Sequence, residues 1–392
     1  MFSWRSVAVF IACSLFVLGA PRAGAQSFQS NAPFAFLMDY DSRAALYEKN
    51  PDAPTAPASM SKLMTAELVF RELKEGRLHL GDHFEVSENA WRTGGAPSHG
   101  SAMFLEVHSR VSVEDLIRGL IVQSGNDAAI TLAEGIAGSE DNFTGMMNKR
   151  AGELGLSRSS FANPWGKPDP RERVTARELA LLAAHLIGDY PEYYRYFGET
   201  EFTWNKVRQL NRNPLLTMDL GADGLKTGEI TESGYGLVGS AVQNGQRLIV
   251  VVNGLKTMAD RAEEARKLLL WGFRSFDART LFQPDEEVGA ASVFGGIQGD
   301  VPLTSDRPIK VFLPHGSDEK LTAKIVYQGP LVAPVAKGVE VARLKVWRGQ
   351  ALVLDVPLRT SQAVGLGSLR QRAFDAGVEL ALDLLRKPFA KN

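Results

Sequence analysis

The pattern of apolar residues changes near Phe282, and this change constrains the fold more than any other feature of the sequence. Before it, helical periodicities alternate with short strand-like runs, which is typical of a domain that mixes helices and sheet. After it, short runs rich in β-branched residues follow one another, with turns such as Pro314-His315-Gly316 between them. A chain of 392 residues is long enough for two cores. The sequence therefore predicts an α/β (α+β) domain over residues 26–278 and a small all-β domain over residues 282–363.

The N-terminal segment, residues 1–25, has the pattern of a cleavable signal peptide. Arg5 precedes a short apolar run, and the small residues Ala23-Gly24-Ala25 follow it. The run is short for a bilayer span, so we expect export followed by cleavage. The only cysteine, Cys13, lies inside this segment, and a lipid-modified Cys13 is the alternative. Cleavage after Ala25 would leave the mature chain with neither a disulfide nor a thiol nucleophile.

The C-terminal segment, residues 366–392, has the periodicity of an amphipathic helix. Leu369, Leu380 and Leu384 share one side, and basic residues outnumber acidic ones from Arg370 onward. Such a helix can lie in a membrane interface or pack on the β domain, and periodicity alone leaves both possibilities open.

The charge balance and the histidines argue against two classes of partner. A formal net charge of −1 gives no electrostatic indication of a nucleic-acid partner. His79 and His83 are four residues apart, but no third ligand lies near them in the sequence, so we predict no metal site and no cofactor.

The stretch from Pro57 to Thr65 places a serine and a lysine at the start of a predicted helix that reaches about Lys74. Ser59 falls in the first turn and Lys62 follows three residues later, so their side chains share one face. A hydroxyl beside an amine is one way to place a nucleophile next to its base. Alone, this spacing is weak evidence, because it arises by chance in most chains of this length, and an N-cap serine with a solvated lysine is the more ordinary interpretation.

Two further short segments have similar ordinary explanations. Ser124-Gly125-Asn126 forms a polar corner between two predicted helices, where Gly125 would allow a tight turn and Asp127 would cap the second helix. Lys226-Thr227-Gly228 is placed at or near the start of the first strand of an antiparallel hairpin. The charged run Arg171-Glu172-Arg173 is interpreted as solvated surface.

Together, these three segments form the combination of motifs found in class A β-lactamases and penicillin-binding proteins. Their surroundings resemble the low-molecular-mass penicillin-binding proteins that act as D-alanyl-D-alanine carboxypeptidases, serine peptidase family S11. The segments that carry this resemblance are Pro57–Thr65, Ile121–Asp127, Asn211–Leu216 and Asp223–Gly228. It covers nearly the whole mature chain. It implies a serine β-lactamase/DD-peptidase-like transpeptidase fold, in which an antiparallel sheet and a helical domain are followed by the all-β domain and the C-terminal helix.

The resemblance implies a role for each residue of the three motifs. Ser59 would be the nucleophile and Lys62 its base, with Lys226 as a second cation that lowers the pKa of Lys62. Ser124 would relay a proton to the leaving amine, and Asn126 would orient the substrate amide.

The resemblance also implies how the substrate is held. Backbone N–H groups of Ser59 and Glu229 would bind the oxyanion, while Lys226, Thr227 and Gly228 would hold the far end of the substrate. Arg261, or else Arg212, would bind the terminal carboxylate.

The sequence departs from the family pattern at two places. Glu229 stands where many members have a histidine, which keeps the backbone donor but adds a carboxylate. In the loop Asn163-Pro164-Trp165-Gly166, Trp165 occupies a variable position that we expect to face the cleft.

The expected partners are peptidoglycan stem peptides that end in D-Ala-D-Ala, and β-lactams. The expected location is the periplasm, with peripheral attachment to the outer face of the inner membrane through residues 366–392. Two alternatives remain: a serine β-lactamase, for which Glu172 is the only loop glutamate available for deacylation, and a non-catalytic penicillin-binding sensor module. The sequence leaves the oligomeric state open.

Overall fold

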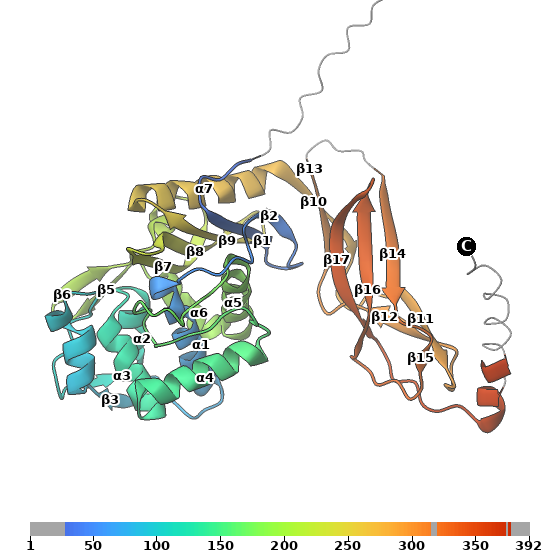
Figure 1. Cartoon of the computed structure of the whole chain (residues 1–392), viewed down its shortest axis with the longest axis horizontal. Coiled ribbons are helices and arrows are strands. Elements are labelled where there is room, and N and C mark those ends of the chain that lie inside the picture. The colour runs from blue at the N-terminus through green and yellow to red at the C-terminus, as the bar shows by residue number, and fades with distance from the viewer. Residues whose placement is uncertain (1–27, 315–319, 374, 378–392) are drawn as a thin grey trace, which may run out of the picture.

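The computed structural model describes residues 28–314, 320–373 and 375–377. Figure 1 shows a larger part that combines helices with a sheet and a second part built from strands, joined where helix α7 (Met258–Ser275) runs into strand β10 (Phe276–Phe282). The predicted signal peptide with Cys13 lies outside the described residues, as does most of the predicted C-terminal helix.

The larger part is built on a five-stranded antiparallel sheet with the strand order β2-β1-β9-β8-β7. Its strands are β1 (Phe34–Asp39), β2 (Ala45–Lys49), β7 (Ala222–Ile230), β8 (Gly234–Gln243) and β9 (Gln246–Leu255). β8 and β9 form a hairpin whose turn, Asn244-Gly245, has both residues at positive φ, as a right-twisted two-residue hairpin requires.

Lys226 lies in the middle of β7, one strand before that hairpin, so its predicted position near the start of a strand is wrong. The reason is that the backbone ladder with β8 begins at Ala222 and continues to Ile230.

Helices cover both faces of this sheet. Alternate residues of β9 point to opposite sides: Ile249 and Val251 join the core of the helical side, whereas Val250 and Val252 pack toward α7. On the helical side lie η1 (Ala58–Ser61), α1 (Lys62–Lys74), α2 (Val113–Ile121), α3 (Asn126–Ala137), α4 (Glu140–Glu153), α5 (Ala176–Asp189), α6 (Pro191–Tyr194) and η4 (Arg195–Gly198). The remaining strands are the pairs β3 (His83–Glu85) with β4 (Arg110–Ser112) and β5 (Glu201–Trp204) with β6 (Val207–Leu210).

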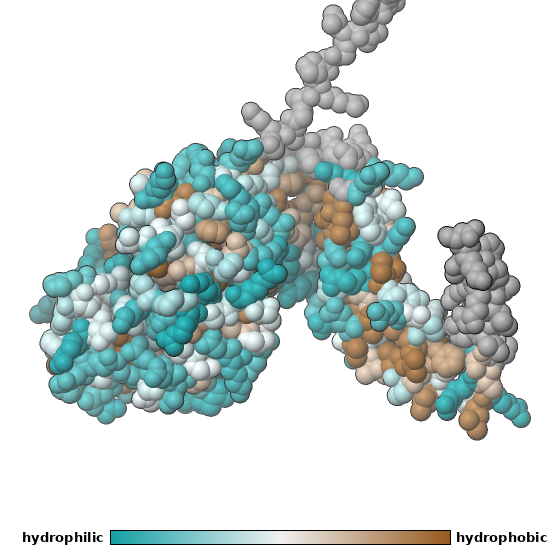
Figure 2. All heavy atoms as spheres, viewed as in Figure 1, coloured by the Kyte–Doolittle hydropathy of each residue, from teal (hydrophilic) through white to brown (hydrophobic). Residues whose placement is uncertain are grey.

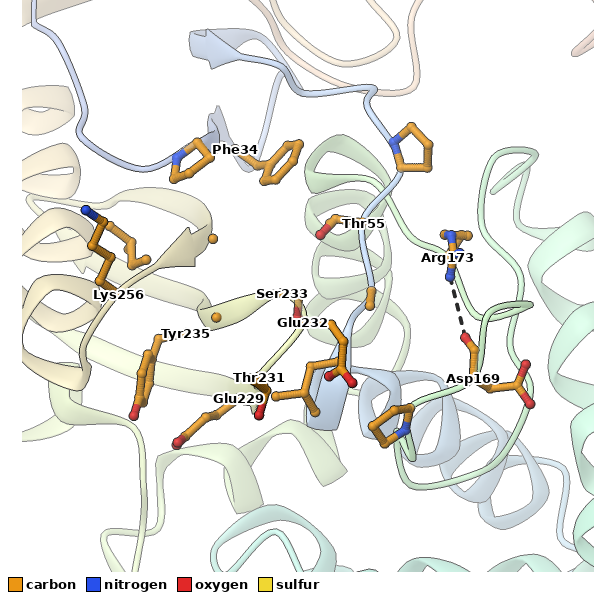
Figure 3. A pocket seen from close by; sticks show the side chains of 18 of the residues that line it. Phe34, Thr55, Asp169, Arg173, Glu229, Thr231, Glu232, Ser233, Tyr235 and Lys256 are labelled. Carbon is orange, nitrogen blue, oxygen red and sulfur yellow. Dashed lines mark hydrogen bonds between the residues drawn. The ribbon is translucent and has the colours of Figure 1, made fainter.

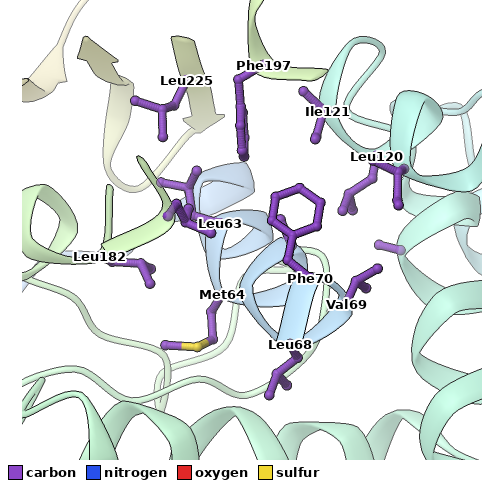
Figure 4. Close-up of a cluster of buried hydrophobic side chains, with 14 of the residues drawn as sticks. Leu63, Met64, Leu68, Val69, Phe70, Leu120, Ile121, Leu182, Phe197 and Leu225 are labelled. Atoms are coloured by element: carbon purple, nitrogen blue, oxygen red, sulfur yellow. The ribbon is translucent and has the colours of Figure 1, made fainter. Parts of the chain in front are cut away.

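Helix α1 lies at the centre of the helical side. Figure 4 shows Leu63, Met64 and Phe70 of this helix surrounded by apolar side chains from several other elements. Because α1 is buried on nearly every face, its first turn is held in a fixed position relative to the sheet.

The second part is all-β, as predicted. A six-stranded sheet has the order β14-β16-β17-β12-β11-β15, and β10 pairs with β13. The strands are β11 (Gly289–Phe294), β12 (Asp300–Thr304), β13 (Ile309–Pro314), β14 (Leu321–Tyr327), β15 (Leu331–Val332), β16 (Glu340–Arg348) and β17 (Ala351–Thr360). It has a core of its own, which includes Val301, Leu344 and Leu358. An ion pair joins the two parts, with Lys310 Nζ 2.6 Å from Asp41 Oδ2.

The described end of the chain is partly helical and carries exposed apolar side chains. Residues 369–373 and 375–377 are helical, and Leu366 and Leu369 are 56% and 80% exposed. Figure 2 shows that the strand-built part has more hydrophobic surface in this view than the larger part. Within the described ranges, no helix has the length and apolarity needed to cross a membrane.

Candidate active site

Ser59 and Lys62 meet at the start of the central helix, as predicted from their spacing. Ser59 lies in the 3-10 turn η1, which continues directly into α1 at Lys62. Lys62 Nζ is 3.0 Å from Ser59 Oγ. Ser59 is half-buried and lines the cavity described below, whereas Lys62 is 1% exposed.

The surroundings of Lys62 suit a neutral amine. Its Nζ donates to Asn126 Oδ1 at 2.8 Å and to the main-chain oxygen of Trp165 at 2.5 Å. A neutral amine has two N–H bonds and one lone pair, so these two carbonyl oxygens satisfy both donors and leave the lone pair for the Ser59 hydroxyl. Burial, and to a lesser extent the nearby Arg212, lower the pKa of Lys62 to about 7, although the carboxylates of Glu172 and Asp127 act in the opposite direction.

The corner between α2 and α3 brings Ser124 and Asn126 to the same place. Ser124 has a φ of 61°, whereas Gly125 has an ordinary φ of −58°, so our expectation that Gly125 makes the tight turn is wrong. Gly125 is needed for space instead, because a Cβ there would lie 2.8 Å from Asp127 Oδ1. Ser124 Oγ is buried and, among the described residues, has no hydrogen-bond partner.

Asp127 does not cap α3, contrary to the sequence-based expectation, because the helix already begins at Asn126 with Gly125 as its N-cap. Its carboxylate accepts the backbone N–H of Met103 at 2.9 Å and of Leu105 at 3.1 Å. Asp127 therefore fixes the segment that contains Met103 and Leu105 to the start of α3.

Strand β7 forms the opposite wall and carries Lys226, Thr227 and Gly228. Lys226 is 2% exposed, and burial together with Lys62 holds its pKa well below the usual lysine range. A Cβ on Gly228 would lie 2.7 Å from the Pro57 carbonyl oxygen, so only glycine lets β7 approach η1 this closely.

Two arginines complete the site. Arg212 donates to Ser101 Oγ at 2.6 Å, and Arg261 is 6% exposed with its guanidinium carbon 5.7 Å from the ring centre of Tyr235. Within the part of the chain that the structure describes, the buried Nε of Arg261 has no hydrogen-bond partner. Burial lowers the pKa of both arginines, and Glu229 acts in the opposite direction.

A cavity of about 700 Å3 connects these groups. It is lined by Ser59, Ser124, Arg212, Thr227, Gly228, Glu229 and Arg261, together with the rim segment His99-Gly100-Ser101. Lys62, Asn126 and Lys226 lie beneath its floor. In the described ranges, no group of three His, Cys, Asp or Glu side chains is arranged to hold a metal ion.

A second cavity, of about 1110 Å3, adjoins the first and shares Glu229, Ile230 and Thr231 with it. In Figure 3, Glu229, Thr231 and Glu232 lie on one side of this cavity, and Asp169 and Arg173 lie on the other. The residues at the end of β7 therefore separate the Ser59 cleft from a larger, mixed-charge hollow.

Two residues of the loop between α4 and α5 differ from the sequence-based interpretation. Trp165 was expected to face the cleft, but its Nε1 donates to Glu140 Oε2 on α4 at 3.1 Å, and only its carbonyl reaches the site. Glu172 is not the solvated surface that the sequence predicts, but is 2% exposed and accepts a hydrogen bond from Ser61 Oγ at 2.7 Å. Burial raises the pKa of Glu172 to about 7.

Comparison with known families covers almost the whole chain. The family model of the D-alanyl-D-alanine carboxypeptidases, peptidase S11, matches residues 21–257. The model of the C-terminal domain of penicillin-binding protein 5 matches residues 276–365.

Individual relatives agree with these matches. The chain is 40% identical over 366 residues to the D-alanyl-D-alanine carboxypeptidase DacC of Escherichia coli, which covers 91% of this chain and 92% of that protein. It is 39% identical over 334 residues to DacA of Haemophilus influenzae, which covers 84% of each. The crystal structure of penicillin-binding protein 5 from Haemophilus influenzae superposes with a TM-score of 0.77 at 37% identity, covering 87% of this chain and 100% of that chain. By sequence and by fold, the chain belongs to the D-alanyl-D-alanine carboxypeptidase family, peptidase S11.

Proposed function

We propose that this protein is a serine-type D-Ala-D-Ala carboxypeptidase that removes the terminal D-alanine from peptidoglycan stem peptides and is acylated by β-lactams at Ser59. The observation that carries the proposal is the position of Lys62 Nζ, 3.0 Å from Ser59 Oγ and held there by two carbonyl oxygens. The names and folds of the relatives support the same activity.

The acylation step follows from this geometry. Ser59 Oγ attacks the carbonyl carbon of the penultimate D-alanine while its proton moves to Lys62 Nζ. The carbonyl oxygen becomes an oxyanion, for which the backbone N–H groups of Ser59 and Glu229 are the proposed donors. Loss of one such donor typically raises the barrier by about 3 kcal/mol.

The leaving step needs a proton on the nitrogen of the terminal D-alanine. Ser124 lines the cavity, and its buried Oγ has no hydrogen-bond partner among the described residues. We propose that with substrate bound this hydroxyl relays a proton from the Lys62 ammonium to the nitrogen as the C–N bond breaks. D-alanine leaves, and a water molecule that gives its proton to Lys62 then hydrolyses the ester.

The far end of the cavity suits the carboxylate of the substrate. Arg212 and Arg261 both line it, and the free Nε of Arg261 is a buried donor that needs an acceptor. Thr227 adds a hydroxyl on the same wall. We therefore assign the terminal carboxylate to these groups. Burial and the nearby Arg212, rather than Lys226, are what lower the pKa of Lys62.

The β-lactamase alternative is less consistent with the site. A class A enzyme uses a loop glutamate for fast deacylation. Glu172 is the only such residue of this loop, and its carboxylate is bound to Ser61 rather than exposed to the cavity. We therefore expect a long-lived acyl-enzyme with penicillin. A sensor module would not need the complete set of proton-transfer groups that the cavity contains.

The test measures D-alanine release from a peptide that ends in D-Ala-D-Ala and the lifetime of the adduct with labelled penicillin. We expect release and a persistent adduct from the unmodified protein, and neither from Ser59→Ala. Ser157→Ala, which changes an exposed serine, is the matched control and should behave like the unmodified protein. Equal release from Ser59→Ala, or no release at all, would contradict the proposal, and rapid turnover of penicillin would indicate a β-lactamase.

We further propose that residues 1–25 are removed on export and that the mature protein acts in the periplasm. Residues 26–278 would be the catalytic domain and residues 282–363 the all-β domain. Residues 366–392 would attach it peripherally to the outer face of the inner membrane. The exposed Leu366 and Leu369 support this attachment, because apolar side chains at the start of an amphipathic helix favour a lipid interface.

A further inference from the structure

Glu172 is a buried carboxylate near Ser59, and the mechanism proposed above does not use it. The backbone of its loop explains why it points inward. Arg173 and Ser160 exchange both backbone hydrogen bonds, at 2.9 and 2.7 Å, while the side chain of Arg171 is 76% exposed. The side chain of Glu172 therefore points toward the interior, whereas those of its neighbours Arg171 and Arg173 do not.

The carboxylate is anchored on the turn that carries the nucleophile. It accepts from Ser61 Oγ at 2.7 Å, and Ser61 stands between Ser59 and Lys62 in the sequence. The backbone N–H of Ala162 is a second donor to it. Glu172 is therefore fixed relative to Lys62 by a side-chain contact and a main-chain contact, without touching Lys62 Nζ itself.

Lys62 needs a counter-charge only during the reaction. When it takes the proton of Ser59 it becomes a buried ammonium, and its partners, Asn126 Oδ1 and the Trp165 carbonyl, are uncharged. An uncompensated buried ammonium is costly. The nearby Arg212 increases that cost, whereas Glu172 and Asp127 lower it.

The two carboxylates are not equivalent. Asp127 already receives backbone N–H groups, including those of Met103, Leu105 and Ala128, which bind its carboxylate for a structural purpose. Among the described residues, no cation is bound directly to the Glu172 carboxylate. The charged groups that act on it are Lys62, which attracts it, and Asp169, which repels it.

We propose that Glu172 is a positioning residue that holds the counter-charge for the Lys62 ammonium formed while Ser59 is acylated. The proposal rests on the proposed function only in taking Lys62 as the base. Burial places the pKa values of both groups near about 7. The titrations of Lys62 and Glu172 are consequently coupled. The fall of the acylation rate toward low pH, its acid limb, therefore reports an apparent pKa of the pair rather than of either residue.

Glu172→Gln tests this role, because glutamine still accepts from Ser61 but carries no charge. Without the carboxylate the ammonium is less stable, so the pKa of Lys62 falls and the acid limb moves to lower pH by about one unit. The weaker base also lowers the plateau rate of acylation by about three- to ten-fold. The measurement is the rate of Ser59 acylation by labelled penicillin from about pH 5 to about pH 9.

Controls separate this role from a structural one. Arg171→Gln alters the exposed neighbour and should leave both the limb and the plateau unchanged. A rate that falls equally at every pH in Glu172→Gln, with an unmoved acid limb, would overturn the proposal.

A second variant, Glu172→Asp, serves if Glu172→Gln does not fold, as judged by its thermal unfolding. It retracts the charge by one methylene and should move the acid limb in the same direction by less. An unmoved acid limb in Glu172→Asp would overturn the proposal as well. Penicillin acylation does not depend on the peptide substrate, so a failure of D-alanine release would sink the proposed function and leave this test intact.

Discussion

Glu229 places a carboxylate beside the arginines that we assign to the carboxylate of the substrate. It lines the cavity with Arg212 and Arg261 and acts electrostatically on both. It also interacts with Tyr235, whose ring lies under the guanidinium of Arg261. At the scale of single residues, the Glu229 carboxylate therefore competes with the substrate carboxylate for Arg212 and Arg261.

Glu229→Gln should lower KM for a peptide ending in D-Ala-D-Ala by roughly three- to ten-fold, as expected for a partly solvated charge pair. We expect little change in kcat, because the backbone N–H proposed for the oxyanion is retained. Steady-state kinetics at low and high salt check this, since the difference between the variants should shrink with salt. Glu232→Gln, an exposed glutamate at the neighbouring turn, is the control. An equal effect in both variants, or a fall in kcat alone, would contradict the prediction.

The family resemblance carried by the three motifs together nominated Ser59, Lys62, Ser124 and Lys226, although each motif alone has an ordinary explanation, and the structure brings all four residues to one site. Sequence reasoning interpreted Glu172 as solvated surface or as the loop glutamate of a β-lactamase, and it did not predict the contact of Glu172 with Ser61. A glutamate between two arginines has the appearance of solvated surface, and its burial depends on the pairing of Arg173 with Ser160, which the sequence does not reveal. The contact of Asn126 with Lys62 was missed for a similar reason, since it joins residues 64 positions apart.

At the scale of elements, the site depends on how closely strand β7 packs against the turn η1. Gly228 is the contact point, since a Cβ there would also lie 3.1 Å from the Met60 side chain. The position of Ser59 in η1 therefore depends on Gly228 of β7 having no side chain. A displacement of this turn would alter the distance between Ser59 and the proposed donor on Glu229.

Gly228→Ala should therefore slow acylation of Ser59 by about ten- to a hundred-fold, because small misplacements of reacting groups are costly. It should also destabilise the protein by about 1–3 kcal/mol through overpacking. Labelled-penicillin kinetics and thermal unfolding measure the two effects. Gly145→Ala is the matched control: Gly145 lies in α4 with open space around it, so we expect normal kinetics and a gain of about 0.5–1 kcal/mol. A Gly228→Ala protein that acylates at the normal rate would refute this account of the wall.

The central helix and the β8–β9 hairpin could be predicted because their signals are local: an apolar periodicity in α1 and the Asn244-Gly245 turn. The position of Lys226 within β7 could not, because the start of that strand is set by its partner β8. Local chemistry therefore predicts which elements form, and pairing across the chain decides where each residue falls in them.

At the scale of the whole molecule, the catalytic part and the all-β part have separate apolar cores. The described start of the C-terminal helix contacts the all-β part, where Gly295 N donates to Asp375 Oδ2 at 2.9 Å. This contact fixes the described start of the helix to the all-β part.

Deletion of residues 368–392 should move the protein from the membrane fraction to the soluble fraction and leave acylation by penicillin unchanged. Fractionation followed by labelling with penicillin measures both. Leu352→Ser removes an exposed apolar side chain elsewhere on the all-β part and should not change the distribution. If the truncated protein stays with the membrane, attachment does not depend on this segment.

The edge position of β7 has one more consequence. A strand at the end of a sheet offers its backbone groups to any extended chain, which is how peptides are recognised by β-augmentation but also how folded proteins begin to aggregate. In this protein that edge borders the Ser59 cavity through Thr227 to Thr231. A ligand that occupies the cavity therefore also covers part of the exposed backbone edge of β7. The purified protein should consequently aggregate more slowly on storage when a slowly hydrolysed β-lactam is bound.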